Sequence, residues 1–309
     1  MQRDIAILIP AFNASATIAE TLDSIQRQEA GLDRAWAVIV ADDRSSDDTV
    51  IAAESAWKSS VPLQVIRNGV NRGERATVNE AALALPMAVA WIFILHADDL
   101  AKPEWLRKML DTIDQSDALV ASVTASYDVL HEDGRLEKGE CAGDGQSAII
   151  RGEPKAIADT LRRGCWWKIS SCAIRMSAFR RLEGFAPDMP QLGDLDFIIR
   201  LMGQGWSIAY LPQCLSIYRQ TNQSVSSKSF LIHRDVREWL RILENYGGLL
   251  PRRDLFLRYQ WLASVLLRRV GRAVLLGRWP RVWTGLAMLP VVLAGSIRAA
   301  IGSRRMLAR

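Results

Sequence analysis

The chain has 309 residues, of which 49% are hydrophobic, so it can bury a sizeable core and is not a disordered protein. Four cysteines without a Cys-x-x-Cys pair or a histidine cluster argue against a zinc site or a disulfide framework and fit a reducing compartment. The net charge is +5, yet residues 234–309 alone carry +11, from fifteen arginines and four acids. This asymmetry indicates an acidic catalytic body with a basic appendage.

Apolar strand-like segments alternate with helical segments through the first half of the chain. The expected strands are residues 5–9, 37–40, 63–66, 91–95 and 119–123, and the expected helices lie near residues 17–25, 47–57, 75–85 and 103–113. The first apolar run ends at Pro10 and is too short for a signal peptide. Thr17 and Glu20 stand at capping-box spacing at the first helix. The alternation predicts an α/β fold with a mostly parallel sheet that is covered by helices on both faces.

The second half of the chain has a different character. Residues 128–163 are polar and glycine-rich and predict loops over a site, whereas residues 194–201 predict a helix. From residue 233 onward the chain is basic and helical, with glycine and proline breaks. We therefore expect a catalytic domain at residues 1–232 and a basic, amphipathic helical region at residues 233–309.

Polar clusters follow three of the predicted strands, at the end where ligands bind in parallel sheets. They are Asn13, Asp42 with Asp43, and His96-Ala97-Asp98-Asp99. Adjacent carboxylates repel each other unless they are neutralised, and hard oxygen ligands suit magnesium or manganese. The alternative is that Asp98 or Asp99 caps the helix that begins near Pro103.

Several short motifs occur in an order and spacing that is specific as a set, although each one alone is weak. They are Ile7–Asn13, Asp42–Asp47, Asn71–Gly73, Asn79, His96–Asp99, Gly184–Phe185, Gly193–Asp196, Arg200–Leu201 and Tyr218–Arg219. Over residues 4–227 this set resembles the nucleotide-sugar domain of family 2 glycosyltransferases. The resemblance implies a GT-A fold, a UDP-, GDP- or dTDP-sugar donor and inversion of the anomeric centre.

The resemblance also implies the residues of the donor site. Asp43 would contact the base with Asp42 beside it, and the remaining donor residues would be Pro10, Phe12, Asn13, Arg75, Asn79 and Asp99. Asp98 would be the principal ligand of a divalent cation, Mn²⁺ or Mg²⁺. Asp194 would be the catalytic base, and its alternative role is to cap the helix that follows it.

The sequence departs from the family pattern at several positions. His96 replaces the first aspartate of the usual Asp-x-Asp motif. A neutral imidazole can bind a metal, but it adds no negative charge. The alternative is that His96 is a histidine at the end of a strand with no role in metal binding. Gly193 stands where a glutamate commonly precedes the base, and Val78 stands at a position that is commonly arginine. Thr221 and Asn222 follow Arg219 where a histidine is often found. These departures weaken the expected metal and diphosphate contacts.

Two adjacent tryptophans, Trp166 and Trp167, fall in the loop that is expected to face the acceptor. Aromatic faces stack on sugar rings, which makes both residues candidates for acceptor binding. The alternative is that one ring packs in the core and the other is partly covered at the surface.

The basic C-terminal region contains one long apolar run. Residues 282–297 are sixteen apolar or small residues interrupted by Pro290, fewer than the roughly 20 that span a bilayer. We therefore expect this region to lie on anionic lipid. The alternative is a helical hairpin that packs on the catalytic domain or in a homo-oligomer. The apolar residues between the arginines argue against nucleic-acid binding.

These observations predict a metal-dependent, inverting glycosyltransferase that transfers a sugar from a nucleotide-sugar to a glycan or lipid-linked acceptor. The expected setting is bacterial cell-envelope polysaccharide synthesis, in the cytoplasm and peripheral on the inner face of the membrane. One alternative is a catalytically inactive nucleotide-sugar-binding scaffold. The other is a nucleotidyltransferase, which the lack of a glycine-rich phosphate loop before the first helix disfavours.

Overall fold

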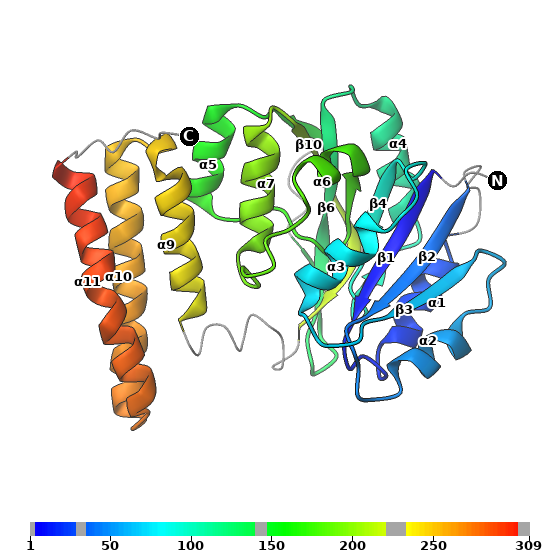
Figure 1. The fold of residues 1–309 in the computed structure, drawn as a ribbon, viewed down its shortest axis with the longest axis horizontal. Coiled ribbons are helices and arrows are strands. Elements are labelled where there is room, and N and C mark those ends of the chain that lie inside the picture. Colours follow the sequence, from blue (N-terminus) through cyan, green and yellow to red (C-terminus); the bar gives the residue numbers. More distant parts are fainter. Residues whose placement is uncertain (1–3, 29–34, 140–146, 221–232, 302–309) are drawn as a thin grey trace. The chain divides into compact units, whose positions relative to one another are not determined.

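A computed structural model describes residues 4–28, 35–139, 147–220 and 233–301, which form two compact units (Figure 1). The first unit comprises residues 1–153 and 167–221, and the second comprises residues 154–166 and 222–309. Cys141, Thr221, Asn222 and the expected domain boundary at residue 232 lie outside the described residues.

The first unit is built on one ten-stranded sheet. Its strands are β1 (Ile5–Ala11), β2 (Trp36–Asp42), β3 (Leu63–Arg67), β4 (Trp91–Ile94), β5 (Leu100–Ala101), β6 (Val120–Leu130), β7 (Leu136–Glu137), β8 (Ala148–Ile150), β9 (Cys172–Arg175) and β10 (Ser207–Arg219). The order is β3-β2-β1-β4-β9-β6-β10-β5, with β7 beside β6 and β8 beside β10. The first four strands in this order are parallel, and β9 runs antiparallel between β4 and β6.

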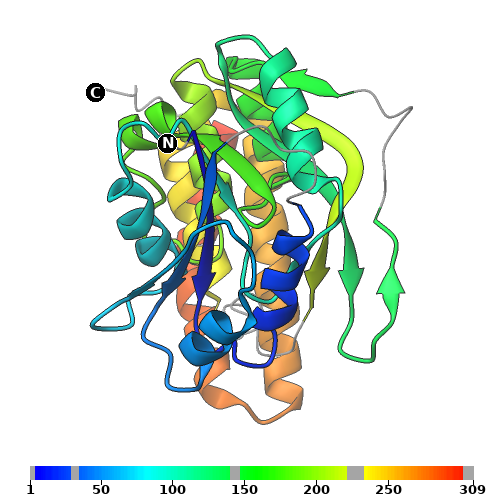
Figure 2. The same ribbon diagram turned by 90° about the vertical axis from the view of Figure 1, so that its right-hand side faces the viewer.

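Helices cover both faces of this sheet, as the continuous burial of β1 requires. The helices of the first unit are α1 (Ile18–Gln26), α2 (Thr49–Ala56), α3 (Glu74–Leu83), α4 (Trp105–Gln115), α6 (Met176–Arg181) and α7 (Gly193–Gly203). Ile5, Ile7 and Ile9 share one core with residues of α1, α2 and α4. Figure 2 shows α1 and α3 on opposite sides of the first strands.

The capping box expected at the first helix does not form. Thr17 precedes α1 without a side-chain cap. Its hydroxyl instead donates to the carbonyl oxygen of Ala97 at 2.9 Å. Thr21, one turn later, donates to the carbonyl oxygens of Ala97 and Asp99. These two threonines therefore anchor the loop after β4.

The second unit is helical. It contains α5 (Pro154–Arg163), α9 (Arg234–Tyr246), the 3₁₀ turn η1 (Gly247–Leu249), α10 (Arg252–Leu275) and α11 (Trp279–Ile301). Helix α5 was missed in the sequence because residues 128–163 were expected to be loops. Ion pairs join its elements: Arg162 with Asp254, and Arg269 with Asp235 through two hydrogen bonds of 2.8 Å.

Pro290 lies inside α11 and does not interrupt it, contrary to the expectation from the sequence. The helix has 23 residues and is long and apolar enough to cross a membrane, by length and composition alone. Buried core helices of soluble proteins meet the same criterion, so α11 by itself is weak support for a membrane span.

Candidate active site

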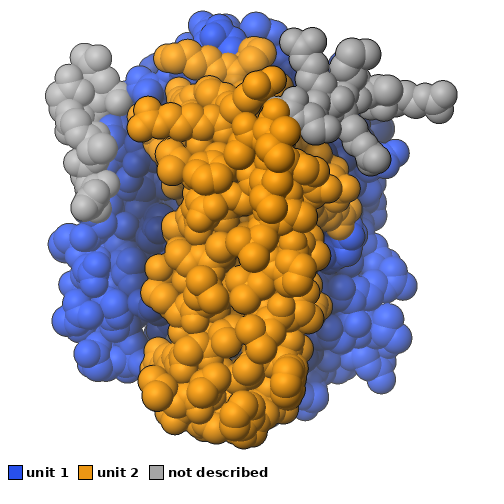
Figure 3. Space-filling view, turned by 90° about the vertical axis from the view of Figure 1, so that its left-hand side faces the viewer, with its two compact units in different colours: residues 1–153, 167–221 blue, residues 154–166, 222–309 orange. Residues whose placement is uncertain are grey.

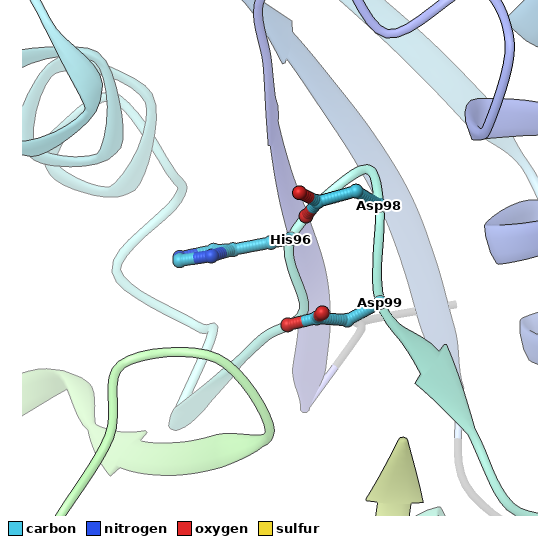
Figure 4. Close-up of side chains that lie close together, drawn as sticks. All are labelled: His96, Asp98 and Asp99. Carbon is cyan, nitrogen blue, oxygen red and sulfur yellow. The ribbon is translucent and has the colours of Figure 1, made fainter. Parts of the chain in front are cut away.

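His96, Asp98 and Asp99 form a cluster on the loop between β4 and β5. Their ligand atoms all lie within 4.8 Å of one another. Figure 4 shows that the three side chains point to the same side of the loop. Because this loop directly follows β4, the cluster lies at the carboxyl end of that strand, where an α/β sheet binds its ligands.

Asp99 is positioned by residues that are distant in the sequence. It is 2% exposed, accepts a hydrogen bond of 2.5 Å from the Ser170 hydroxyl and accepts one of 2.9 Å from the backbone N–H of Arg219. Burial and the neighbouring Asp98 raise the pKa of Asp99 to about 6. Asp99 therefore keeps most of its charge at neutral pH, and the two adjacent carboxylates repel each other unless a cation neutralises them.

His96 is paired with a carboxylate that the sequence motifs did not include. Its Nε2 lies 3.2 Å from Oε1 of Glu74, at the start of α3. Burial alone would lower the pKa of His96, but Glu74 raises it to about 9. With this pKa the ring is an imidazolium at neutral pH in the absence of a cation. An imidazolium has no lone pair for a metal.

The donor set fits a hard divalent cation. Asp98 and Asp99 supply the carboxylate oxygens that Mg²⁺ and Mn²⁺ prefer. The ligand atoms of the cluster lie within 4.8 Å of one another, which groups them around one candidate ion position. His96 could join them only after losing its proton.

Asp194 lies in the first turn of α7 and is paired with Arg75 of α3. The backbone N–H of Ile169 donates to its second oxygen at 3.1 Å. Burial raises the pKa of Asp194, and the Arg75 guanidinium opposes this shift. Arg75 also contacts Glu74 at 2.9 Å, so an alternating chain of charges runs from His96 through Glu74 and Arg75 to Asp194.

One short segment before β9 contacts both halves of the site. Ile169 binds Asp194 through its N–H, and the next residue, Ser170, binds Asp99 through its hydroxyl. The Ser170 oxygen also accepts from the N–H of His96 at 3.1 Å. The same short segment of backbone therefore positions both the candidate base and the carboxylate cluster.

The two aspartates at the end of β2 are buried and bonded within the protein. Asp43 accepts from the N–H groups of Arg72 and Gly73, both at 2.8 Å, and from the side chain of Asn68. Asp42 accepts from the N–H of Ser45 and lies 3.4 Å from Arg67. Their oxygens therefore hold the loops around the expected base site, whatever contact they also make with a donor.

The other expected donor residues lie at the end of β1 and on α3. Pro10 is in β1, and Phe12 beyond it is 52% exposed. Asn13 has a φ of 50° and accepts from the N–H of Ser46 at 2.8 Å, which ties the ends of β1 and β2 together. The side-chain amide of Asn79 donates to the carbonyl oxygen of Phe185 and accepts from its N–H, both at 2.8 Å. Asn79 therefore holds the backbone at Phe185 in place.

The tryptophan pair is split between the two units. Trp167 is fully buried in the first unit, packs against Phe185 and Phe197, and donates to the Ser122 hydroxyl at 2.9 Å. Its faces are covered, so it does not offer the stacking surface that an acceptor role requires. Trp166 is half-buried in the second unit and donates to Thr160 at 3.0 Å.

Three further residues belong to the site and were missed in the sequence. Glu74 pairs with His96, and Ser170 binds Asp99. The Nζ of Lys168 lies 3.7 Å from the centroid of the Tyr127 ring and 4.1 Å from that of the Tyr218 ring. Only Glu74 could have been found from the sequence, because it directly precedes the expected donor residue Arg75. Lys168 and Ser170 lie outside every motif that the sequence contains.

The family model "Glycosyl transferase family 2" matches residues 6–182, so the chain belongs to this family, as the resemblance predicted. An uncharacterized glycosyltransferase of Haemophilus influenzae is 27% identical over 202 residues, covering 64% of this chain and 62% of that protein. The putative teichuronic acid biosynthesis glycosyltransferase TuaG of Bacillus subtilis is 23% identical over 241 residues, covering 75% of this chain and 88% of TuaG.

Solved structures share the fold. S. aureus TarS 1-349 in complex with UDP-GlcNAc matches with a TM-score of 0.63 at 14% identity, over 98% of this chain and 93% of that one. Mannosyltransferase PcManGT from Pyrobaculum calidifontis, in complex with GDP-Man and Mn²⁺, matches with a TM-score of 0.57 at 16% identity, over 98% and 89%. The GT-A-type α/β fold with C-terminal helices is thereby confirmed, and the chain is a family 2 glycosyltransferase.

Proposed function

We propose that this transferase is inverting and metal-dependent, and that it moves a sugar from a nucleotide-sugar donor to a hydroxyl group of a glycan or lipid-linked acceptor. Asp98 and Asp99 would hold the cation, and Asp194 would be the general base. Its raised pKa suits a base that works near neutral pH. The main observation behind the proposal is that two adjacent residues, Ile169 and Ser170, hydrogen-bond to Asp194 and Asp99, respectively.

In the proposed reaction, Asp194 takes the proton of the acceptor hydroxyl as that oxygen attacks the anomeric carbon. The bond from this carbon to the diphosphate oxygen breaks on the opposite face, and the nucleoside diphosphate leaves. The cation, when bound, would neutralise charge on the diphosphate. Arg75 and Ile169 would keep the Asp194 carboxylate oriented, while Ser170 and Arg219 would do the same for Asp99.

The acceptor is proposed to be a bacterial cell-envelope glycan, on the cytoplasmic side of the membrane. The support is the relation to TuaG and the basic charge of residues 234–309. A donor screen tests the transferase proposal. The protein is incubated with UDP-, GDP- and dTDP-sugars, with Mn²⁺ or with chelator, and release of nucleoside diphosphate is measured. Absence of metal-dependent release with every donor would contradict the proposal.

A second candidate is a scaffold that binds donor without turnover. Two contacts favour it: the pair of His96 with Glu74, which raises the pKa of His96 to about 9, and the ion pair of Asp194 with Arg75. It predicts that a nucleotide-sugar raises the melting temperature of the protein although no nucleoside diphosphate is released. The nucleotidyltransferase alternative predicts release of pyrophosphate instead.

A further inference from the structure

Helix α11 exposes an apolar stripe along its whole length. The stripe repeats every three or four residues and consists of Trp279, Trp283, Leu286, Pro290, Leu293, Ile297 and Ile301. The residues other than proline are 39–77% exposed. Figure 3 shows the second unit in orange, with an elongated surface. A stripe of this length needs a partner that is itself extended and apolar.

The opposite face of α11 is locked against α10. A Cβ atom added at Gly285 would lie 2.5 Å from Cγ2 of Val270, and one added at Gly295 would collide with the ring of Tyr259. Such close contacts require glycine on α11 and hold the two helices as one hairpin. For α11 to act alone in a membrane, it would have to leave α10 and expose this packed face.

The hairpin as a whole is poorly suited to cross a bilayer. Helix α10 carries Arg252, Arg253, Arg258, Arg268, Arg269 and Arg272. Arg269 is also paired with Asp235 of α9. Moving these guanidinium groups into hydrocarbon is costly, so the length of α11 alone does not make it a membrane span. The exposed stripe can meet lipid without such a cost only if the hairpin stays at the surface.

Charge distinguishes a lipid partner from a second copy of the chain. No acid follows Asp254, whereas ten arginines do. Two α11 helices packed face to face would bring Arg281 and Arg298 of one copy near the like charges of the other, with no acid on either helix to pair with them. Anionic lipid headgroups complement these charges. Trp279 and Trp283 are of the residue type that prefers the membrane–water interface.

We propose that α11 lies lengthwise in the headgroup region of an anionic membrane, with its apolar stripe inward and without crossing. This inference deepens the proposed function, because it identifies the surface through which the transferase would reach a membrane-linked acceptor. At 1.5 Å per residue the buried stripe would extend about 34 Å in the membrane plane.

The test is a depth measurement on the full chain bound to vesicles. Cys141, Cys165 and Cys214 are replaced by serine, and the fully buried Cys172 is retained. Single spin labels are introduced through Leu286→Cys, Leu293→Cys and Ile301→Cys. Their accessibility to oxygen and to a water-soluble nickel complex is measured on vesicles of phosphatidylcholine with phosphatidylglycerol, and on phosphatidylcholine alone.

The proposal predicts the same shallow depth for all three labels, and only on the vesicles that contain phosphatidylglycerol. A maximum of depth at Leu293 would overturn it in favour of a spanning helix. A steady decrease from Leu286 to Ile301 would overturn it in favour of insertion by the tip of the hairpin. Spin–spin broadening without vesicles would show a second copy on the stripe and would also overturn it.

A charge substitution provides a second readout. Leu286→Glu combined with Leu293→Glu should abolish flotation with the anionic vesicles, whereas Met87→Glu, at an apolar residue of the first unit that is 80% exposed, should not. Equal flotation of the double variant and the parent would contradict the proposal. Neither readout needs turnover, so failure of the transferase proposal and failure of this one are distinguishable.

Discussion

Arg75 and Asp194 form an ion pair in the interior of the first unit, where their side chains are 7% and 17% exposed. Arg75 also bonds Glu74, which in turn holds His96 of the carboxylate cluster. The candidate base is therefore coupled electrostatically to the candidate metal site. Because Arg75 was expected to bind the donor, this pairing gives it a second role that experiments can separate from the first.

Replacement of Asp194 by asparagine should reduce turnover about 10²–10⁴-fold, the usual contribution of a general base. The amide keeps the size of the side chain and can still accept from the N–H of Ile169, but it cannot take a proton. Donor affinity, measured by calorimetry, should change little. An equal loss of affinity and turnover would place Asp194 in the donor site instead.

The matched control is Asp196→Asn, on the same helix. Asp196 bonds Arg200, one turn further along α7, at 2.7 Å. Its replacement should lower the melting temperature while the turnover of the folded protein stays near that of the parent.

Replacement of Arg75 by methionine should shift the acidic limb of the kcat/KM–pH profile to higher pH. The guanidinium opposes the upward shift that burial gives to the pKa of Asp194, so its loss raises that pKa further. A base must be unprotonated to act, so activity at low pH falls first. Arg75→Lys retains the charge and should shift the limb less. If the limb is unchanged and only the donor KM rises, Arg75 binds the diphosphate and does not tune Asp194.

Replacement of Asp98 by alanine should abolish metal-dependent donor binding, since Asp98 is the more exposed of the two carboxylates available to a cation. The measurement is a calorimetric titration of Mn²⁺ with UDP, GDP or dTDP, whichever nucleotide binds the parent. Asp48→Ala, an exposed acid before α2, is the control and should bind like the parent. Parental affinity in the Asp98 variant would contradict the metal assignment.

The sequence predicted the features that depend on local patterns. The apolar runs gave the main strands, and the acidic pairs at their ends marked the loop of His96, Asp98 and Asp99. Contacts between distant segments could not be read in this way. Asn79 and Phe185 are 106 residues apart and bond through both polar atoms of the amide, which no periodicity indicates. The ionised state of His96 likewise depends on Glu74, brought to it by folding.

Two errors have a common physical cause. A polar, glycine-rich composition hid helix α5, and a proline was expected to break α11. Both helices are held by tertiary contacts, such as Arg162 with Asp254 for α5 and the close approach of Gly285 to α10 for α11. Packing of this kind overrides local propensity, which is worth only about 1–3 kcal/mol even for glycine or proline.

Asp128 should contribute stability that is lost in acid. It is 1% exposed, and Lys102 contacts it at 2.7 Å while the N–H of Gly139 donates at 3.0 Å. Burial alone would raise its pKa, but these bonds, with a further one from Lys138, hold the pKa well below the usual 3.8. A group whose pKa is lowered by folding stabilises the protein above its unfolded value, and this contribution disappears as the pH falls towards the folded value.

The variants Lys102→Met and Lys138→Met test this prediction, because both lysines bond the same oxygen of Asp128. The side chain of Lys102 is 27% exposed and that of Lys138 is 76% exposed, so solvent screens the second pair far more. At neutral pH, Lys102→Met should cost about 1–3 kcal/mol in the free energy of unfolding by urea, and Lys138→Met should cost less than about 1 kcal/mol. The cost of Lys102→Met should shrink as the pH is lowered below 3.8. A cost that is the same at neutral and acidic pH would show that Lys102 stabilises the protein through packing and not through the charge of Asp128.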